Sequence, residues 1–198
     1  MDYDYNKLAQ LLFPDVTGTV EELEQKYPER QLKEGARVTR FAPSPTGYLH
    51  IGGLFGALVD VLTAKATDGV AFLRVEDTDK KREIDDGVSA IINGFASFGI
   101  DFDEGVTGFN TEKGAYGPYT QSQRAEIYHT VAKELVQKGL AYPCFCTAEE
   151  LSDIRAEQEK GDALIWGYFG KWAKCRNLSY EEIEENIKAG KPYVLRFR

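Results

Sequence analysis

A proline- and glycine-rich segment, Arg40–Gly53, joins a short apolar-leaning run at Val38–Phe41 to an apolar-rich stretch from Leu54 to about Ala66. This pattern predicts a strand, a loop and a helix. Val70–Val75 follows as a second, largely apolar strand, as expected when both faces of a strand are covered. Strands that alternate with helices form parallel sheets, so we expect an α/β fold with a doubly wound parallel sheet.

The clearest helical periodicity follows the second strand. Apolar residues recur at steps of three and four, at Ile84, Val88, Ile91, Ile92, Phe95 and Phe98. Gly99 is placed to end this helix at the C′ position. From about Glu104 to Pro118 the chain is rich in glycine, and we expect a loop and a segment boundary there.

Shorter helices are indicated on either side of this region. Leucines near the N-terminus and apolar residues on one side of 124–138 favour two of them. The capping-box spacing predicts three helix starts, at Thr19, Thr147 and Ser179. Residues 193–198 alternate as a strand, and the chain stops inside it without a closing turn. We therefore expect a fragment of a longer protein.

Composition limits the classes of function. The chain has 198 residues, enough for one full domain or two small ones. Its apolar runs are shorter than the ~18 residues that span a bilayer. The N-terminus lacks the basic and apolar regions of a secretory signal, so we expect an intracellular protein. A net charge of −8 disfavours a nucleic-acid binder that acts through overall charge, but it allows a local basic patch.

The loop Pro43–Gly53 has the chemistry of a phosphate site. Such a turn lies at the carboxyl end of a strand, where ligands bind in doubly wound sheets. The following helix start offers free N–H groups and positive partial charge, and Gly52 and Gly53 leave the backbone accessible. His50 can donate to phosphate oxygens. The chain has neither GxGxxG nor a P-loop motif. Taken alone, the glycine pair favours a structural turn with a surface histidine over a phosphate site.

The full string and several later motifs resemble the class I aminoacyl-tRNA synthetases specific for glutamate. His50–Gly53 is similar to their HIGH signature, with glycine in the fourth place. Ser44 and Thr46 match the glutamyl enzymes, because the glutaminyl relatives carry Glu and Asn there. The resemblance runs from about Val38 to the end, through Leu73–Asp79, Gly117–Tyr119, Gln121–Arg124, Tyr142–Cys146 and Lys174–Leu178. It implies a Rossmann-like catalytic fold with a mixed α+β insertion that grips the tRNA acceptor stem.

The resemblance implies the N-terminal part of a glutamate–tRNA ligase. Such enzymes join L-glutamate to tRNA(Glu) through glutamyl-adenylate, with ATP and Mg²⁺. We expect a cytoplasmic monomer with three segments: an N-terminal extension at 1–36, the first half of the catalytic domain at 37–110, and a truncated acceptor-stem insertion at 111–198. The family's lysine-rich KMSKS-type loop does not occur in this sequence. We therefore expect weak ligand binding and no useful adenylation from this stretch alone.

Matching the motifs assigns site residues. Arg40 is expected to bind the side-chain carboxylate of glutamate through two parallel hydrogen bonds, beside Ala42 and Ser44. Glu76 is expected to accept from the amino group of the substrate. The ATP contacts implied by the resemblance are Pro43, Thr46, His50, Gly52 and Gly53, the last three at the catalytic centre. Asp79 and Arg82 are expected to meet tRNA, although the charge run around them is equally a solvated helix start.

Three cysteines, Cys144, Cys146 and Cys175, make a disulfide framework improbable in a chain without a signal peptide. Their spacing resembles a zinc site of some family members. A fourth ligand is missing, since Asn177 is a poor donor and Tyr168 or an outside group would have to complete the shell. We favour three reduced thiols and expect no metal.

Two alternative functions stay open. One is a short paralogue that glutamylates a modified base in tRNA, and the other is a non-catalytic module that binds tRNA or nucleotide. The length does not separate them, because the anticodon-binding region that such paralogues lack would lie beyond this chain. The extension before Val38 favours a full synthetase.

Overall fold

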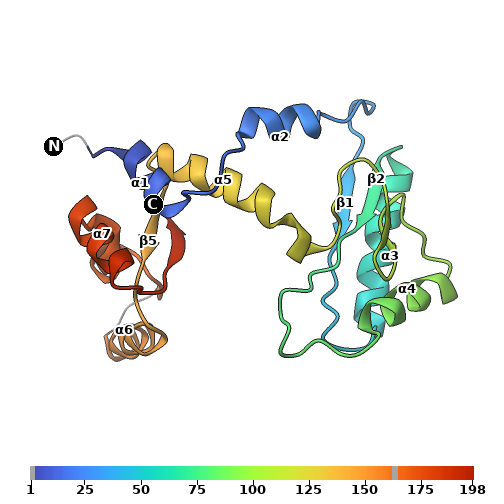
Figure 1. The fold of residues 1–198 in the computed structure, drawn as a ribbon. Helices are drawn as coiled ribbons and strands as arrows, with labels where there is room; N and C mark the ends of the chain where they lie inside the picture. Colours follow the sequence, from blue (N-terminus) through green and yellow to red (C-terminus); the bar gives the residue numbers. More distant parts are fainter. Residues whose placement is uncertain (1–2, 162–164) are drawn as a thin grey trace. The chain divides into compact units, whose positions relative to one another are not determined.

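The computed structural model describes residues 3–161 and 165–198, and the chain forms two compact units. Unit 1 comprises residues 1–20 and 129–198, and unit 2 comprises residues 21–128 (Figure 1). These limits differ from the expected segments 1–36, 37–110 and 111–198. The N-terminal extension contributes to both units, and residues 111–128 pack with the parallel sheet.

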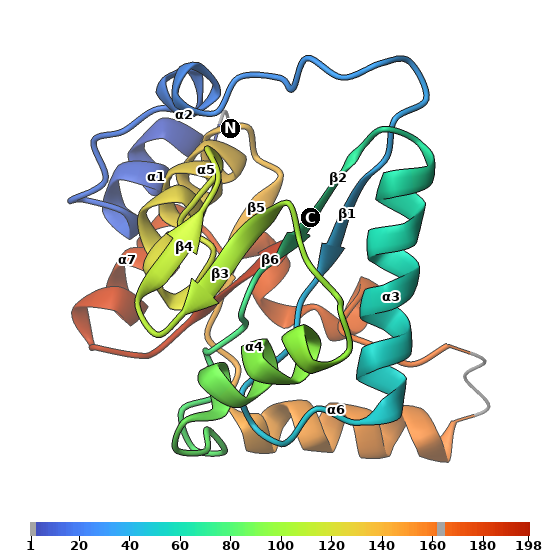
Figure 2. The same cartoon turned by 90° about the vertical axis from the view of Figure 1, so that its right-hand side faces the viewer.

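Unit 2 is built on a four-stranded sheet in the order β1-β2-β3-β4. β1 (Val38–Phe41), β2 (Val70–Leu73) and β3 (Glu104–Gly108) run parallel, and β4 (Thr111–Lys113) is antiparallel to β3. α3 (Ile51–Ala66) joins β1 to β2, and α4 (Gly87–Ser97) joins β2 to β3 (Figure 2). The α/β class is thus confirmed. Because the strand order advances in one direction, right-handed crossovers place both helices on one face in the described residues.

The core of unit 2 lies between this sheet and the two helices. Phe95 packs edge-on against Phe41 and Phe102, with ring centroids 5.5 and 5.4 Å apart. Full burial of a phenylalanine contributes about 1.5–3 kcal/mol. The buried cluster comprises Ala57, Ala64, Ala71, Leu73, Ile91, Phe95, Ile100 and Phe102. It fixes the directions of β1 and β2, whose carboxyl ends carry the candidate site.

The helix predicted from Ile84 begins later, at Gly87. Asp86 has a left-handed φ of 57°, and the Ile84 amide donates to the Pro45 carbonyl at 3.0 Å instead of entering a helix. Gly99 ends the helix as expected, with a φ of 66° and its amide bonded to Ala96. Phe98, expected on the apolar side, is 68% exposed.

The expected loop between Glu104 and Pro118 contains the β3–β4 hairpin, so that prediction was wrong. Asn110, with a φ of 56°, lies in the turn between the strands. Gly105 has a φ of 125°, and a Cβ there would lie 2.3 Å from the Leu73 carbonyl oxygen. Glycine therefore permits the close pairing of β3 with β2, where its abundance had indicated a loop.

Unit 1 contains a two-stranded antiparallel sheet, formed by β5 (Ala141–Cys144) and β6 (Val194–Phe197). Its helices are α1 (Tyr5–Leu12), most of α5 (Ala125–Gln137), α6 (Ala148–Lys160) and α7 (Tyr180–Lys188). The capping boxes at Thr147 and Ser179 are both formed, as predicted. The core comprises Leu8, Ala9, Leu12, Val136, Ala141 and Ile183. In the described part of the chain, no helix is long and apolar enough to span a membrane.

The N-terminal extension contributes side chains to unit 2 after α2 (Val20–Lys26). Arg30 donates two hydrogen bonds of 2.6 Å to the Glu104 carboxylate and lies 3.8 Å from the centre of the Tyr116 ring. The Tyr119 hydroxyl donates to the same carboxylate at 2.6 Å. Burial and this bond raise the pKa of Tyr119 to about 12, so the hydroxyl stays protonated and donates. Residues 21–36 of the extension are therefore part of the unit 2 fold.

Candidate active site at the carboxyl ends of two strands

The loops that follow β1 and β2 lie side by side in unit 2. Backbone bonds join them: Arg74 N–H donates to the Phe41 carbonyl at 3.0 Å, and Glu76 N–H donates to the Pro43 carbonyl at 2.9 Å. Pro45 is fully buried, while Ala42, Pro43 and Thr46 are half-buried. The residues predicted to contact glutamate and ATP thus lie on a loop that backbone hydrogen bonds and the burial of Pro45 hold in place.

Arg40 and Glu76, expected to bind opposite ends of a substrate, contact each other here. Arg40 Nη1 donates to Glu76 Oε1 at 2.9 Å, and the two side chains are 41% and 34% exposed. Ser44 Oγ donates to the Glu76 carbonyl at 2.8 Å. The structure therefore brings together three residues predicted from two motifs, at the strand ends where ligands of such sheets bind.

His50 is the N-cap of α3, so the glycine-rich loop opens a helix as predicted. Its Nδ1 accepts a long hydrogen bond of 3.4 Å from the Gly53 amide. This contact favours the tautomer that carries its proton on Nε2, which points that nitrogen's hydrogen toward other acceptors. A Cβ on Gly52 would lie 3.0 Å from the His50 ring, so glycine makes room for the ring at this helix start.

Asp77 is a residue that the motif comparison left without a role. It is buried and accepts from the Ser122 amide at 2.8 Å, from the Ser122 hydroxyl at 2.5 Å and from Lys80 Nζ at 3.0 Å. Burial raises the pKa of Asp77, but these hydrogen bonds outweigh it and hold the pKa below its usual value. Asp77 therefore anchors the loop after β2 to the Gln121–Arg124 turn (η1). Both motifs were visible in the sequence, but their contact was not.

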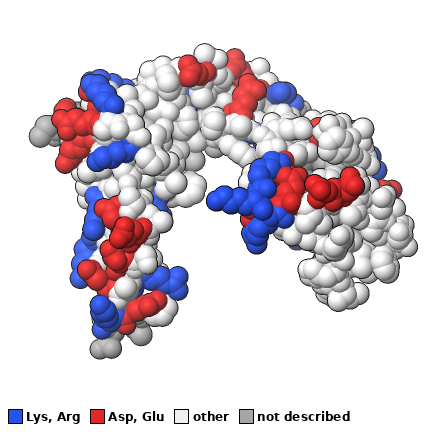
Figure 3. Space-filling model, turned by 60° about the horizontal axis from the view of Figure 1, so that its bottom comes forward, with Lys and Arg blue, Asp and Glu red and all other residues white. Residues whose placement is uncertain are grey.

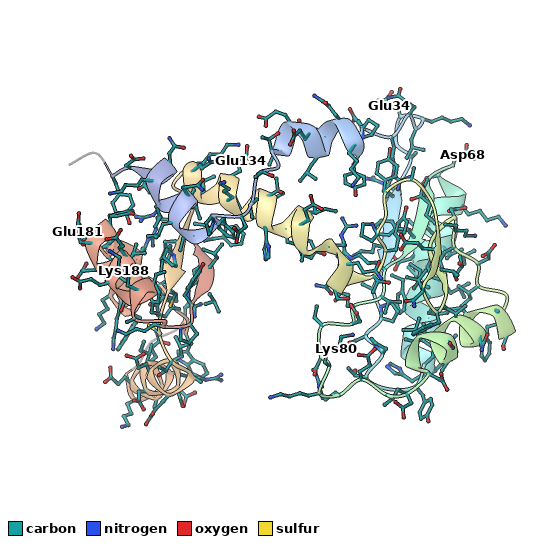
Figure 4. The ribbon with its side chains drawn as sticks, in the orientation of Figure 1. Glu34, Asp68, Lys80, Glu134, Glu181 and Lys188 are labelled. Carbon is teal, nitrogen blue, oxygen red and sulfur yellow. The ribbon has the colours of Figure 1, made fainter. Side chains whose placement is uncertain are left out.

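The residues expected to meet tRNA lie further along the same loop, where Figure 4 labels Lys80. Arg82 Nε donates to Asp79 at 2.6 Å, and Lys80 Nζ donates to Glu83 at 2.9 Å. In Figure 3, which brings this end of unit 2 forward, basic side chains gather beside acidic ones. The loop is therefore a surface of mixed charge, and its cations are partly neutralised.

Unit 1 gathers the three cysteines into one cluster. Their Sγ atoms all lie within 4.8 Å of one another, with Cys146 and Cys175 at 3.7 Å. The Tyr168 hydroxyl lies 3.2 Å from Cys146 Sγ and accepts from the Cys175 amide at 3.1 Å. Burial raises the pKa of Cys144, but hydrogen bonds from Tyr168 and its neighbours lower it to about 7, so this thiol ionises readily. The four side chains form a compact group of soft and oxygen donors.

Comparisons with known proteins agree with this picture. Residues 37–198 match the family model described as tRNA synthetases class I (E and Q), catalytic domain. The chain is 52% identical to a glutamate–tRNA ligase of Clostridium beijerinckii over 98% of its own length and 35% of the relative's. A relative with the same name from Acetivibrio thermocellus is 50% identical, with 98% and 36% covered.

A solved structure is similar as well. It is a glutamate tRNA ligase from Elizabethkingia meningosepticum in complex with its amino acid, 39% identical, with a TM-score of 0.69. The match covers 83% of this chain and 32% of that one. The chain thus spans about a third of the length of the proteins that it matches.

Proposed function

Because this chain belongs to the class I tRNA synthetases of the glutamate and glutamine group, we propose that it is the N-terminal part of an enzyme that attaches L-glutamate to tRNA(Glu). In the first step the α-carboxylate of glutamate attacks the α-phosphorus of ATP, giving glutamyl-adenylate and diphosphate. In the second step the glutamyl group passes to the terminal adenosine of the tRNA, and AMP leaves.

The pairing of Arg40 with Glu76 carries this proposal. A guanidinium and a carboxylate 2.9 Å apart offer complementary partners for the side-chain carboxylate and the ammonium group of glutamate. Ser44 and Ala42 line the same loop, and the Ser44 hydroxyl adds a neutral hydrogen-bonding group. Glutamine lacks the side-chain charge, so Arg40 favours glutamate over it.

We assign the start of α3 to Mg²⁺–ATP. Its N-terminal amides and the Nε2–H of His50 are suited to phosphate oxygens, and Gly52 and Gly53 let the nucleotide approach the backbone. Pro43 and Thr46 complete the proposed contacts from the preceding loop. These groups contribute by positioning the reactants and by stabilising phosphate charge, without a covalent intermediate on the protein.

We assign the loop after β2 to the tRNA end. Arg82 supplies the cation, and Asp79 orients it through their 2.6 Å bond. Residues of unit 1 form the segment that we assign to the acceptor stem. Because ribosomes use charged tRNA in the cytoplasm, we place the enzyme there. We further propose that it acts as a monomer.

We further propose that the cysteine cluster holds a structural Zn²⁺. Two sulfurs bound to one tetrahedral zinc at ~2.3 Å lie about 3.8 Å apart. Cys146 and Cys175 are 3.7 Å apart, and all three thiols lie within 4.8 Å of one another. From the sequence we expected free thiols, because it offered no clear fourth zinc ligand beside the three cysteines. The Tyr168 oxygen, 3.2 Å from Cys146, is the donor that completes the set.

Metal analysis of the purified 198-residue chain tests this zinc proposal. We expect about one zinc per chain, because three thiolates and one oxygen fill a tetrahedral shell. Cys175→Ser should lower the zinc content at least tenfold, since it removes a buried thiolate ligand. His129→Ala, which removes a histidine outside the cluster, serves as the control. Zinc near zero in the unaltered chain would contradict the proposal.

The proposed activity is tested by tRNA charging with the protein extended to the length of its relatives. We expect radioactive glutamate, and not glutamine, to join tRNA(Glu) in an ATP-dependent reaction. Periodate oxidises the terminal ribose and should abolish charging, because the ester forms at that ribose. Charging that survives periodate would indicate transfer to an internal base, and tRNA binding without any glutamate transfer would indicate a non-catalytic module.

A further inference from the structure

The two charged groups assigned to glutamate, on Arg40 and Glu76, are paired with each other. Arg40 Nη1 bonds Glu76 Oε1, so the substrate cannot engage both groups without breaking their contact. The pair is more than one-third exposed at both ends, and exposed pairs contribute only ~0–1 kcal/mol. A ligand can therefore break this pair at little cost in free energy, provided that the Glu76 side chain keeps its position when Arg40 turns to the ligand.

A third charged residue, Arg74, stands at the same carboxylate oxygen. Its Nη2 lies 3.6 Å from Glu76 Oε1, the atom that Arg40 contacts. Arg40 is paired in register with Phe72, and side chains alternate along a strand, so Arg74 projects from the same face of the sheet as Arg40. The Arg74 side chain is 19% exposed, whereas that of Arg40 is 41% exposed. Arg74 is thus the enclosed cation of the two.

The backbone of Glu76 is already fixed on both sides. Its amide donates to the Pro43 carbonyl at 2.9 Å, and its carbonyl accepts from Ser44 Oγ at 2.8 Å. The remaining freedom lies in its side chain, and in the described residues Arg40 and Arg74 are the cations paired with that carboxylate. When Arg40 turns to a substrate, Arg74 is the group left to hold the carboxylate.

We propose that glutamate binds by an exchange of ion pairs in which Arg74 is the positioning residue. The substrate's side-chain carboxylate replaces Glu76 on Arg40, and its ammonium replaces Arg40 on Glu76. Arg74 keeps the Glu76 side chain in place throughout. This inference rests on the proposed function and adds to it a residue that the motif comparison did not assign.

Arg40, Arg74 and Glu76 together also favour a substrate that carries a net negative charge. The two guanidinium groups and the one carboxylate together carry one net positive charge. Glutamate carries one net negative charge at neutral pH, and glutamine carries none. Arg74 supplies the excess charge, because Arg40 and Glu76 cancel. Removal of the Arg74 charge should therefore weaken glutamate binding and narrow its advantage over glutamine.

The test measures glutamate-dependent charging of tRNA(Glu) by the full-length protein with Arg74→Gln and Arg74→Lys. For Arg74→Gln we expect KM for glutamate to rise about 10-fold, because the change removes the positive charge 3.6 Å from the Glu76 carboxylate, with kcat and KM for ATP changed less than about threefold. Arg74→Lys retains the charge and should recover at least half of the loss on a logarithmic scale. Arg37→Gln removes the same charge at the opposite end of β1 and should leave KM unchanged.

The outcomes separate the two proposals. If the unaltered protein does not charge tRNA with glutamate, the proposed function fails. If it does, but Arg74→Gln leaves KM for glutamate and the preference over glutamine within about twofold, the role of Arg74 is refuted. Equal increases of KM for glutamate and ATP would also refute it, because they indicate a general loss of structure. Where Arg74→Gln does not fold, Arg74→Met, which keeps an unbranched side chain without the charge, is judged by the same criteria.

Discussion

Replacing Arg40 by alanine is expected to lower kcat/KM for glutamate about 100- to 10,000-fold, because it removes two parallel charged hydrogen bonds to the substrate, each worth roughly 1.5–3 kcal/mol. The measurement is tRNA charging by the full-length protein at subsaturating glutamate. The effect should appear chiefly in KM for glutamate, since Arg40 meets a substrate group remote from the reacting α-carboxylate. KM for ATP should stay within about threefold, because the nucleotide is assigned to the separate helix start.

Arg40→Lys is the matched variant for this prediction. It keeps the positive charge but loses the planar fork, so its activity should fall between those of the unaltered protein and Arg40→Ala. Calorimetry with L-glutamate and L-glutamine supplies a second measurement, and Arg40→Ala should abolish the preference for glutamate. An equal response to both amino acids in the unaltered protein, or no effect of Arg40→Ala, would overturn this assignment. Stability is a control: the exposed pair with Glu76 should change the free energy of unfolding by less than ~1 kcal/mol.

Local pattern and motif were sufficient to predict most of the framework of the site. β1 spans the predicted residues, and α3 ends at the predicted Ala66, because apolar periodicity and glycine content are properties of neighbouring residues. The parallel pairing of β1 with β2 follows from the alternation of strand and helix. Arg40 and Glu76 were assigned to one site by the motif resemblance, and their positions at the carboxyl ends of two neighbouring parallel strands favoured that assignment.

What sequence did not predict depends on contacts between distant segments. The β3–β4 hairpin was taken for a loop, since the close approach of Gly105 to Leu73 exists only after the strands pair. The late start of α4 depends on the bond from Ile84 to Pro45, which the local pattern does not contain. Two-residue periodicity places Arg74 on the same face as Phe72, but the register that pairs Phe72 with Arg40 is known only from the structure. The zinc proposal likewise depends on the gathering of thiols from separated elements.

The second large effect is expected at Glu104, where the N-terminal extension joins unit 2. Arg30 and Glu104 are only 17% and 14% exposed, and Tyr119 donates to the same carboxylate. Glu104→Ala leaves a guanidinium and a hydroxyl enclosed without their acceptor. Breaking a buried pair in this way costs about 3–5 kcal/mol, and we expect about 3 kcal/mol here because the pair retains some solvent.

Amide hydrogen exchange on the 198-residue chain measures this loss unit by unit. In Glu104→Ala, protection of the β2 and β3 amides should fall about 100-fold, the equivalent of roughly 3 kcal/mol at 1.4 kcal/mol per tenfold change. The β5 amides in unit 1 should change little. Both tryptophans, Trp166 and Trp172, also lie in unit 1, so their fluorescence is a parallel control. Glu29→Ala removes an exposed carboxylate beside Arg30 and should leave protection unchanged.

The pH dependence of stability provides an independent measure of the contact between Arg30 and Glu104. The hydrogen bonds from Arg30 outweigh burial and hold the pKa of Glu104 below its ordinary value of 4.5. The carboxylate therefore binds fewer protons in the folded state than in the unfolded state. Its stabilisation is fully present above the unfolded pKa and is lost as pH falls through the folded pKa. The difference in β3 protection between the unaltered chain and Glu104→Gln should thus be constant near neutral pH and shrink below about pH 4.5. A difference that does not depend on pH would mean that packing, rather than the charge of Glu104, holds the extension to unit 2.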